Sequence, residues 1–318
     1  MRKDKYQKWI DDNCSSLSDK TIVVLGATGS IGKEIVDIVS SLSANVIIAV
    51  RSVSKGEALL LEMQEKYPEI YYKLFLVDMS NRDSIDSFVK EIKQVKVDYF
   101  ISCAGVYHLN QKILDDGLEI HFATNYFNHI YLIENIEAHI KKDGGKMIIM
   151  ESISHRFFKI NFNDLMSLKT KNKTKVYARS KRLLVYHTLN KINNGSPLIL
   201  CHPGISATSL FSSEKGGFSS TFNKLIVPIM KRIFISPKKA SLSVILSLFK
   251  DVPYGYQVGP RGLFHIWGYP KIYKFARTLK NKNKQEKIVE LYNKKINEIC
   301  NKFYHFDNHK LLLKDNAY

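Results

Sequence analysis

Short apolar runs alternate with segments of helical periodicity through most of the chain. The runs are rich in Val, Ile, Leu, Phe and Tyr and predict strands at Thr21–Leu25, Asn45–Val50, Tyr72–Val77, Tyr99–Ser102, Lys146–Glu151 and Pro197–Cys201. Between them, apolar residues at helical spacing predict helices at Gly32–Leu42, Lys55–Lys66, Ser80–Lys93, Glu119–Lys141 and Val176–Asn193. The strands are apolar throughout, as expected when helices cover both faces of a parallel sheet. The pattern predicts an α/β fold with a doubly wound parallel sheet.

We expect a single domain, because no internal repeat or low-complexity linker interrupts this pattern. Residues 1–18 are expected to form a polar leader, residues 19–268 the domain, and residues 269–318 a basic helical extension. Residues 207–249 hold an apolar stretch broken by prolines, which we expect to close a substrate pocket as a helical lid, although part of it must pack on the core. One face of a C-terminal helix is marked by Ile288, Leu291, Tyr292, Ile296, Ile299 and Phe303.

The composition limits the class of protein and the cellular location that we expect. Hydrophobic residues make up 45% and charged residues 25% of the 318 residues, the values of an ordinary globular protein. No apolar run reaches the roughly 20 residues that span a bilayer, and the polar start of the chain has no signal-peptide core. A reducing, cytoplasmic location is favoured because the cysteines show no paired spacing. These cysteines are Cys14, Cys103, Cys201 and Cys300.

The net charge of +18 admits several explanations. Lysines dominate it and become denser after Tyr269, where solvation of helices is the simplest reason for them. An anionic substrate, or peripheral association with an anionic membrane, is the second explanation. The residues that would face lipid phosphates are Lys224, Lys231, Arg232, Lys238 and Lys239. No recognition motif accompanies the charge, so we expect no nucleic-acid partner.

A glycine-rich turn follows the first predicted strand. Gly26 allows a tight turn, Gly29 or Ser30 lets the backbone approach a pyrophosphate, and Gly32 lets the next helix pack closely on the strand. The arrangement places phosphates at a helix N-terminus. It predicts a Rossmann-type dinucleotide site. The residues of the turn that we expect to bind the cofactor are Gly26, Thr28, Gly29, Ser30, Ile31 and Gly32.

The choice of cofactor depends on the end of the second strand. An acidic residue there accepts hydrogen bonds from a ribose 2′-hydroxyl, whereas an arginine binds a 2′-phosphate. Arg51 stands at this point, Lys55 follows and no acid is near, so NADP(H) is favoured over NAD(H) unless Arg51 is only a surface charge. Asp78 and Met79 end the third strand, where the carboxylate can bind the adenine amino group, cap the next helix, or do both.

Tyr177 and Lys181 lie one helical turn apart in the sequence Tyr-Ala-Arg-Ser-Lys. Free tyrosine is a poor acid or base at neutral pH because its pKa is about 10. A neighbouring ammonium, together with a positive nicotinamide ring, stabilises the phenolate and lowers that pKa. A tyrosine and a lysine on a helix surface are common at this spacing. Following the glycine turn, however, the pair indicates a nicotinamide-dependent oxidoreductase.

From about Lys20 to Leu210 the sequence resembles the short-chain dehydrogenase/reductase family. Ser102-Cys103-Ala104-Gly105 is similar to the family's Asn-Asn-Ala-Gly after the fourth strand, which implies cofactor contacts for Ala104 and Gly105. The segment around Asn125 resembles the one that carries the active-site asparagine. The end of the fifth strand resembles the one that supplies the catalytic serine, matched by Ser152, with Ser154 as the second candidate.

The resemblance continues after the sixth strand. His202-Pro203-Gly204 and the residues to Thr208 are similar to the stretch that holds the nicotinamide carboxamide. It implies cofactor contacts for Pro203, Gly204, Ile205 and Thr208. The resemblance as a whole implies four catalytic residues: Asn125, Ser152, Tyr177 and Lys181. Ser152 and Tyr177 would bind a carbonyl oxygen, Tyr177 would transfer the proton, Lys181 would hold the ribose, and Asn125 would position a water.

Finer features resemble the retinol-dehydrogenase-like and protochlorophyllide-reductase-like branch. They include the segment Ile160–Leu165 and the His-Pro-Gly phrase, and they imply an apolar carbonyl or alcohol as substrate. The chain departs from the family at Ser30, Cys103 and Glu151, the last of which replaces the first serine of a usual pair. Long helices at Glu119–Lys141 and Val176–Asn193 would be the face of a homodimer, as in relatives.

Two other functions remain open on this evidence from the residues. The glycine spacing also fits nucleotide-sugar epimerases or dehydratases of the extended branch, which act on polar substrates. A non-catalytic NADPH-binding redox sensor is the second alternative, although it would not need all four catalytic types. We expect no metal site, because the ten histidines show no His-Glu-x-x-His spacing and no Cys-x-x-Cys partner.

Overall fold

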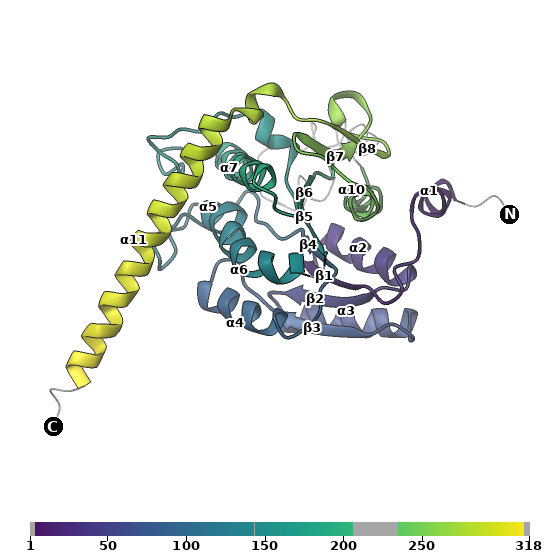
Figure 1. Ribbon diagram of the computed structural model, residues 1–318, viewed down its shortest axis with the longest axis horizontal. Coiled ribbons are helices and arrows are strands. Elements are labelled where there is room, and N and C mark those ends of the chain that lie inside the picture. The colour runs from purple at the N-terminus through teal and green to yellow at the C-terminus, as the bar shows by residue number, and fades with distance from the viewer. Residues whose placement is uncertain (1–3, 143, 206–234, 315–318) are drawn as a thin grey trace, which may run out of the picture.

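The strands form one eight-stranded sheet in the order β3-β2-β1-β4-β5-β6-β7-β8 (Figure 1). The computed structural model describes residues 4–142, 144–205 and 235–314, with side chains described as far as Ile299. The strands are β1 (Thr21–Leu25), β2 (Asn45–Val50), β3 (Tyr72–Leu76), β4 (Tyr99–Ser102), β5 (Lys146–Met150), β6 (Leu198–Cys201), β7 (Tyr256–Pro260) and β8 (Pro270–Lys274). All neighbours pair in parallel except β7 and β8, which are antiparallel. The strand order reverses between β1 and β4, where such sheets form a ligand crevice.

Helices cover both faces of the sheet (Figure 1). They are α1 (Lys5–Asn13), α2 (Ser30–Ser41), α3 (Val53–Lys66), α4 (Arg82–Ile92), α5 (Ile120–Phe122), α6 (Asn128–Lys142), α7 (Lys173–Asn193), α10 (Pro237–Phe249) and α11 (Lys282–Lys314). A π-helical turn, η1 (Ala123–Phe127), joins α5 to α6. Three short 3-10 turns are η2 (Ile153–Arg156), η3 (Leu263–His265) and η4 (Arg277–Lys280).

Two apolar clusters lie on opposite sides of the sheet, because consecutive strand residues point to opposite faces. Ile22 and Val24 of β1 join the cluster formed with α1, α2, α3 and α10. Val23 and Leu25 join the cluster formed with α4, α6, α7 and α11. All four side chains are at most 1% exposed. The continuous apolar character of the strand therefore reflects burial on both faces, and the predicted α/β fold with a doubly wound parallel sheet is confirmed.

The predicted strands agree with the observed ones to within one residue at each end. The helix predicted at Glu119–Lys141 is instead divided among α5, η1 and α6. In η1 the Asn128 N–H bonds to the Ala123 carbonyl, five residues back, so one extra residue is accommodated in the turn. Asn125 lies within this turn and is fully buried.

The sequence pattern did not predict the hairpin of β7 and β8 or helix α1. Residues 5–13 of the expected polar leader form α1, which buries Tyr6 and Ile10. Trp9 stacks on Tyr269 with ring centroids 6.1 Å apart, and the Tyr269 hydroxyl donates to the Lys5 carbonyl at 3.0 Å. The start of the chain is thereby attached to the beginning of β8.

Trp9→Ala should lower the free energy of unfolding by about 1 kcal/mol, because an offset aromatic pair contributes this much beyond its buried area. Urea denaturation followed by circular dichroism measures the change. Lys8→Ala is the matched control, since Lys8 lies on the same helix with a 69% exposed side chain and should change stability by less than about 0.5 kcal/mol. Equal effects of the two substitutions would show that α1 is not held by this ring contact.

Part of the expected lid is described and is a core helix. Within residues 207–249, α10 packs against α2 and against the strands from β5 to β8. Its buried side chains include Leu242, Val244 and Ile245. Residues 206–234 lie outside the described residues, and with them Thr208, Lys224, Lys231 and Arg232. For that stretch, closure of the pocket stays a prediction.

The basic C-terminal extension begins with β8 and continues into the long helix α11, which extends away from the rest of the molecule in Figure 1. Its first part packs against α7. Tyr292 is 1% exposed, and its ring lies 4.7 Å from that of Phe127 and 4.9 Å from that of His187. Helix α11 thus occupies part of the face on which a homodimer was expected.

The described residues show neither a helix suited to cross a bilayer nor a metal-ligating group. No described helix is both long enough and apolar enough to span the membrane. Within the same residues, no three or more His, Cys, Asp or Glu side chains are arranged to hold a metal ion.

Candidate functional site

The glycine turn forms the floor of a crevice at the carboxyl ends of β1 and β4. Gly26 has φ +86°, and a Cβ on it would lie 2.8 Å from the Ala104 backbone nitrogen. A Cβ on Gly32 would lie 2.2 Å from the Gly26 carbonyl oxygen. Gly29 caps α2 without a side-chain hydrogen bond to the first helical amides. These amides and the close glycine backbone suit the pyrophosphate of a dinucleotide.

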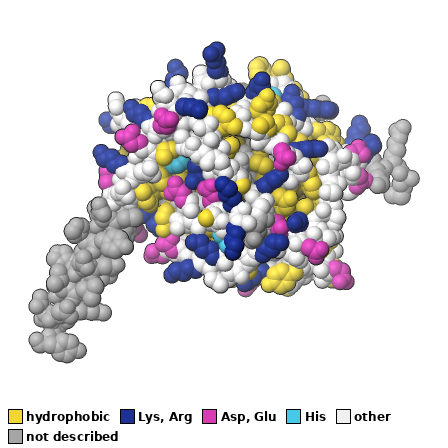
Figure 2. Space-filling view, viewed as in Figure 1, with side chains coloured by type: hydrophobic (Ala, Val, Ile, Leu, Met, Phe, Trp, Pro, Cys, Tyr) yellow, Lys and Arg dark blue, Asp and Glu magenta, His cyan; other side chains and the backbone are white. Residues whose placement is uncertain are grey.

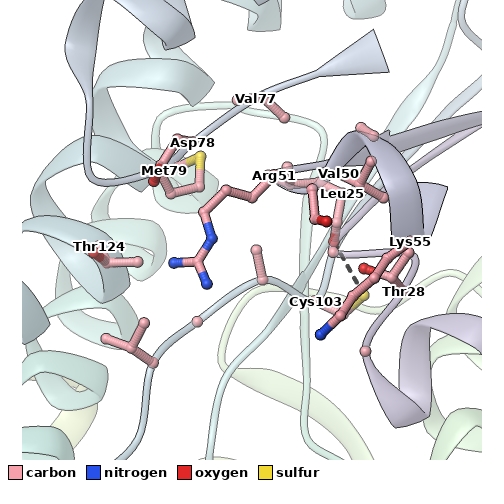
Figure 3. A pocket seen from close by; sticks show the side chains of 17 residues that line it. Leu25, Thr28, Val50, Arg51, Lys55, Val77, Asp78, Met79, Cys103 and Thr124 are labelled. Carbon is pink, nitrogen blue, oxygen red and sulfur yellow. Dashed lines mark hydrogen bonds between the residues drawn. The ribbon is translucent and has the colours of Figure 1, made fainter. Parts of the chain in front are cut away.

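Two adjoining pockets share this floor. The first is lined by the turn, by Arg51 and Lys55, and by Asp78 and Met79. Figure 3 shows the Arg51 guanidinium reaching from the end of β2 into this pocket, while the Lys55 ammonium lies near Thr28 and Cys103. Among the described residues of the lining, Asp78 is the only one with a carboxylate. The described lining of this pocket therefore contains two cations, Arg51 and Lys55.

Asp78 and Met79 are also held by contacts of their own. The Asp78 carboxylate accepts hydrogen bonds from the Ser80 N–H at 2.8 Å and from the Ser80 hydroxyl at 2.7 Å. The cap of α4 is Asn81, whose side chain accepts from the Ser84 N–H. Asp78 therefore stabilises the turn before the helix rather than its first amides. The Met79 carbonyl accepts from the Asn128 side chain at 2.8 Å.

The second pocket brings together the other end of the turn and the expected catalytic side chains. Ser152, Tyr177 and Lys181 line it, together with Gly105, Pro203 and Gly204. The remaining lining residues that had been expected to bind cofactor are Gly26, Gly29, Ser30, Ile31, Gly32 and Ala104. Ile205 is adjacent, and its N–H donates to the Ile266 carbonyl at 3.3 Å.

Of the two candidate catalytic serines, Ser152 lines this pocket and Ser154 is not among the lining residues. The Ser154 hydroxyl and the Ser152 hydroxyl lie 3.0 Å apart, so Ser154 supports Ser152 from η2. Burial raises the pKa of Tyr177 to about 12, while its hydrogen bond to Ser152 lowers it and the charge of Glu151 raises it further. The phenol is thus protonated at neutral pH, the form that can donate a proton to a carbonyl oxygen.

Lys181 is a buried ammonium beside this phenol. Its Nζ donates to the Met150 carbonyl at 3.2 Å, and only 4% of the residue is exposed. Burial lowers the pKa of Lys181 to about 8, and the nearby Glu151 carboxylate opposes this shift. Lys181 is therefore poised between its charged and neutral forms near physiological pH.

Asn125 fixes the loop after β4. Its side-chain oxygen accepts from the Val106 N–H at 2.8 Å, and its nitrogen donates to the Val106 carbonyl at 2.9 Å and to the Ser180 hydroxyl at 3.1 Å. A Cβ on Gly105 would lie 3.0 Å from this oxygen and 3.5 Å from the Lys181 Nζ. The Asn125 oxygen and the Lys181 ammonium thus both lie close to Gly105, and the water expected between the two side chains stays a prediction.

The sequence pattern missed several pocket residues. The Tyr107 ring meets that of Tyr177 edge to face, with centroids 4.8 Å apart. Thr124 and Glu151 are also in the linings. Cys103 donates its thiol to the Leu25 carbonyl at 3.0 Å, and burial raises its pKa to about 12. This cysteine therefore remains a thiol. Cys103 and Glu151 could be noted in the sequence only as departures from the family pattern, and no spacing rule gives any of these residues a role.

Comparisons with known proteins agree with this geometry. A family model described as short chain dehydrogenase matches residues 20–162. Human retinol dehydrogenase 13 is 28% identical over 236 residues, which cover 71% of this chain and 71% of that protein. Polyprenol dehydrogenase of Danio rerio is 26% identical over 71% of this chain and 72% of that protein. Bovine retinol dehydrogenase 12 is 30% identical over 61% of this chain and 64% of that protein.

Solved structures share the fold. An uncharacterized protein from Mycobacterium paratuberculosis superposes with a TM-score of 0.69 at 21% identity, covering 88% of this chain and 94% of that one. L-Sorbose reductase from Gluconobacter frateurii, solved with NADPH and L-sorbose, gives a TM-score of 0.56 at 17% identity, covering 74% and 91%. The comparisons thus support a place in the short-chain dehydrogenase/reductase family, near its retinol dehydrogenases, and an NAD(P)-dependent activity on alcohol or carbonyl groups.

Proposed function

We propose that the protein is an NADP(H)-dependent oxidoreductase that reduces the carbonyl group, or oxidises the hydroxyl group, of an apolar small molecule. The proposal rests on one observation: a single pocket is lined by Ser152, Tyr177 and Lys181 and by the glycine turn. Two cations in the neighbouring pocket support the preference for NADP(H). The similarity to proteins named retinol dehydrogenase and polyprenol dehydrogenase supports an apolar substrate.

The bound nicotinamide would supply or accept the hydride. In the reductive direction, Ser152 and Tyr177 hold the carbonyl oxygen, and the Tyr177 hydroxyl gives its proton to the oxygen as negative charge develops there. Lys181 binds the ribose hydroxyls and stabilises the phenolate that remains. Asn125 keeps the loop after β4 in place and positions the water through which the proton is replaced.

Consumption of NADPH with added apolar aldehydes tests this function. All-trans-retinal and nonanal should be reduced with one NADPH oxidised for each alcohol formed, while the polar ketose L-sorbose should be a poor substrate. Absorbance of NADPH and chromatography of the alcohol give the stoichiometry. Binding of NADPH without turnover of any aldehyde or ketone would instead support a redox sensor. Retention of the cofactor during conversion of a nucleotide sugar would support an epimerase.

We also propose that the protein associates peripherally with anionic membranes through the loop between β7 and β8. Leu263, Phe264 and Trp267 are 63%, 71% and 40% exposed. No acidic residue occurs between residues 252 and 280, whereas Lys and Arg do. In Figure 2, apolar side chains gather over β7, β8 and α10, with Lys and Arg among them. Apolar side chains within a basic surface favour an anionic lipid interface.

This loop is close to the second pocket. The Ile266 carbonyl accepts the Ile205 N–H at 3.3 Å, and a Cβ on Gly204 would lie 2.4 Å from the same oxygen. Gly204 lines the pocket that holds Tyr177. An apolar substrate dissolved in the membrane would then have a short path to the site.

Leu263→Ser combined with Phe264→Ser should reduce binding to vesicles of phosphatidylserine and phosphatidylcholine at least about tenfold, because each side chain gains more than 1 kcal/mol on full burial. Flotation of the protein with these vesicles measures the bound fraction. Leu61→Ser is the matched control, since Leu61 is 67% exposed on α3. A parent protein that fails to float with anionic vesicles would contradict the proposal.

A further inference from the structure

A network of hydrogen-bonded, buried polar side chains lies beside the second pocket. It connects the wall that holds Ser152 with the wall that holds Gly204. Glu151 follows β5 and precedes Ser152, while His202 follows β6 and precedes Pro203 and Gly204. Gln257 of β7 lies between them in the interior. Glu151, His202 and Gln257 are at most 2% exposed. Burial of so many polar groups is costly unless each finds a partner.

Along this network, each group donates a hydrogen bond to the next one, from Gly204 to Glu151. The Gly204 N–H donates to His202 Nδ1 at 3.1 Å, so the neutral ring carries its proton on Nε2. That Nε2–H donates to the Tyr273 hydroxyl. With the Gln257 amide oriented to suit its neighbours, Tyr273 donates to its oxygen at 3.2 Å, and its nitrogen donates to Glu151 Oε1 at 2.9 Å. The network begins at a backbone amide and ends at a carboxylate, which only accepts.

The second oxygen of Glu151 is also occupied. Glu151 Oε2 accepts from His155 Nδ1 at 2.5 Å, and the same Nδ1 lies 2.7 Å from the Ser152 carbonyl. Since both neighbours of Nδ1 are acceptors, this nitrogen carries a proton. Arg156 adds a cation, because its guanidinium donates to the Tyr273 hydroxyl at 3.2 Å and to the Gln257 oxygen at 3.2 Å. Each oxygen of Glu151 thus has a donor, as an ionised carboxylate requires.

Ionisation of Glu151 has consequences for the pair in the pocket. Burial alone would raise the pKa of Glu151, but His155, His202 and Arg156 lower it below its ordinary value. The resulting negative charge raises the pKa of both Lys181 and Tyr177. Lys181 donates to the carbonyl of Met150, the residue that precedes Glu151. The carboxylate therefore opposes the loss of a proton from either side chain.

We propose that Glu151 is a positioning residue whose buried carboxylate keeps Lys181 charged and, through the side-chain hydrogen bonds to Gly204, fixes the catalytic wall of the pocket to the wall that would face the nicotinamide. This inference rests on the proposed roles of Tyr177 and Lys181. Although Glu151 is in the pocket lining, in this role it acts through Lys181 and Gly204 rather than on the substrate. In the family pattern that the sequence resembles, this position is a serine.

Titratable and charged groups face Glu151 from every neighbouring element. They are His155 and Arg156 of η2, Tyr177 and Lys181 of α7, Cys201 of β6, His202 beyond it, and Tyr273 of β8. Burial lowers the pKa of His202 to about 3, and burial raises the pKa of Cys201. Both are therefore neutral at the pH values of the experiment. Lys181, whose pKa is lowered to about 8, is the group whose protonation the experiment follows.

Glu151→Gln should shift the pH profile toward lower pH by about one unit, since a nearby charge typically shifts a pKa by one to three units. In the reductive direction with nonanal, the alkaline limb of kcat/KM moves down because Lys181 loses its proton earlier. In the oxidative direction with nonan-1-ol, loss of the carboxylate favours the Tyr177 phenolate directly but also removes the Lys181 charge that stabilises it, so this acidic limb should move less than the reductive limb. A merely structural defect would lower the rate without moving the reductive limb.

Three further variants make the test decisive. Glu151→Asp keeps the negative charge, so the alkaline limb of the reductive profile should stay at the parent position. Glu151→Ser removes the charge and should shift this limb as far as Glu151→Gln does. If Glu151→Gln does not fold, Glu151→Ser replaces it. Tyr273→Phe interrupts the hydrogen bonds but leaves the carboxylate, so the limb should stay in place. An unshifted limb in folded Glu151→Gln or Glu151→Ser, or an equal shift in Glu151→Asp, would overturn the inference.

Two measurements separate this inference from the proposed function. Tyr177→Phe is assayed in parallel, and retention of activity in that variant would refute the proposed function itself. Fluorescence titration with NADPH across about pH 6 to 10 needs no substrate. In Glu151→Gln the affinity should begin to fall about one pH unit earlier than in the parent protein, because neutral Lys181 binds the ribose less well. Identical profiles for the two proteins would contradict the role of Glu151 alone.

Discussion

Tyr177→Phe is expected to reduce turnover of an apolar aldehyde by roughly 10²–10⁴-fold, the contribution of a positioned general acid. The substitution removes the proton donor of the pocket but keeps the ring and its edge-to-face contact with Tyr107. Binding of NADPH should change little, since Lys181 and the glycine turn are retained. Steady-state kinetics with NADPH and nonanal, together with a fluorescence titration of the cofactor, measure the two quantities separately.

Tyr186→Phe is the matched control for this substitution. Tyr186 lies on the same helix, α7, and its hydroxyl donates to the Thr278 carbonyl at 3.3 Å, outside both pockets. Its activity should stay within a few-fold of the parent protein. If Tyr177→Phe kept nearly full turnover while Ser152→Ala did not, the proton would have to come from another group and the assignment of Tyr177 would be wrong.

Arg51→Ala is expected to weaken NADPH binding by roughly 10–100-fold, because a hydrogen bond to a charged group contributes about 1.5–3 kcal/mol. Binding of NADH should be almost unchanged, since that cofactor has no 2′-phosphate. The preference between the two cofactors should therefore shrink by the same factor. Fluorescence titrations of both cofactors at equal ionic strength measure it, because salt weakens contacts of this exposed cation.

Lys90→Ala tests whether the loss of any surface cation would have the same effect. Lys90 is exposed in the last turn of α4 and lies in neither pocket lining. We expect no change in either affinity. Equal weakening of NADPH and NADH by Arg51→Ala would mean that Arg51 contacts a part common to both cofactors, and the predicted preference for NADP(H) would fail.

Much of the fold could be predicted because buried strands leave a clear trace in the sequence. Continuous apolar runs predicted six of the eight strands in the described residues, since both faces of most of them are covered. The exception is the edge strand β3, in which Leu76 is 46% exposed. The hairpin was missed for a physical reason. Strand β8 exposes Lys271 and Lys274 at the edge of the sheet, and β7 ends in Gly-Pro. Edge strands of this kind carry no apolar run.

Helix α1 was missed because its docking depends on a few side chains among charged neighbours. Only Tyr6 and Ile10 are buried in it, and the stacking partner of Trp9 lies some 260 residues away. The division of the helix at Asn125 was missed too, since a π-helical turn has no periodicity of its own at this length.

The residues of the candidate site also fall into two groups, those that could be identified from the sequence and those that could not. The glycine turn, Arg51 and the pair of Tyr177 and Lys181 could be identified from spacing, because each is a local arrangement within one segment. The roles of Tyr107 and Glu151 could not, since their contacts come from elements far apart in sequence. Glu151 was visible only as a departure from a pattern. Its partners from β7, β8 and η2 were needed to give that departure a physical meaning.

The π-helical turn at Ala123–Phe127 imposes a length requirement on this part of the chain. Each residue advances an α-helix by about 100°, so removing one residue here would straighten the turn and rotate α6 by that amount. Leu132 and Ile136, which are buried beneath the sheet, would then be carried toward solvent. Selection should therefore preserve the number of residues in this segment, and insertions or deletions among homologues should avoid it.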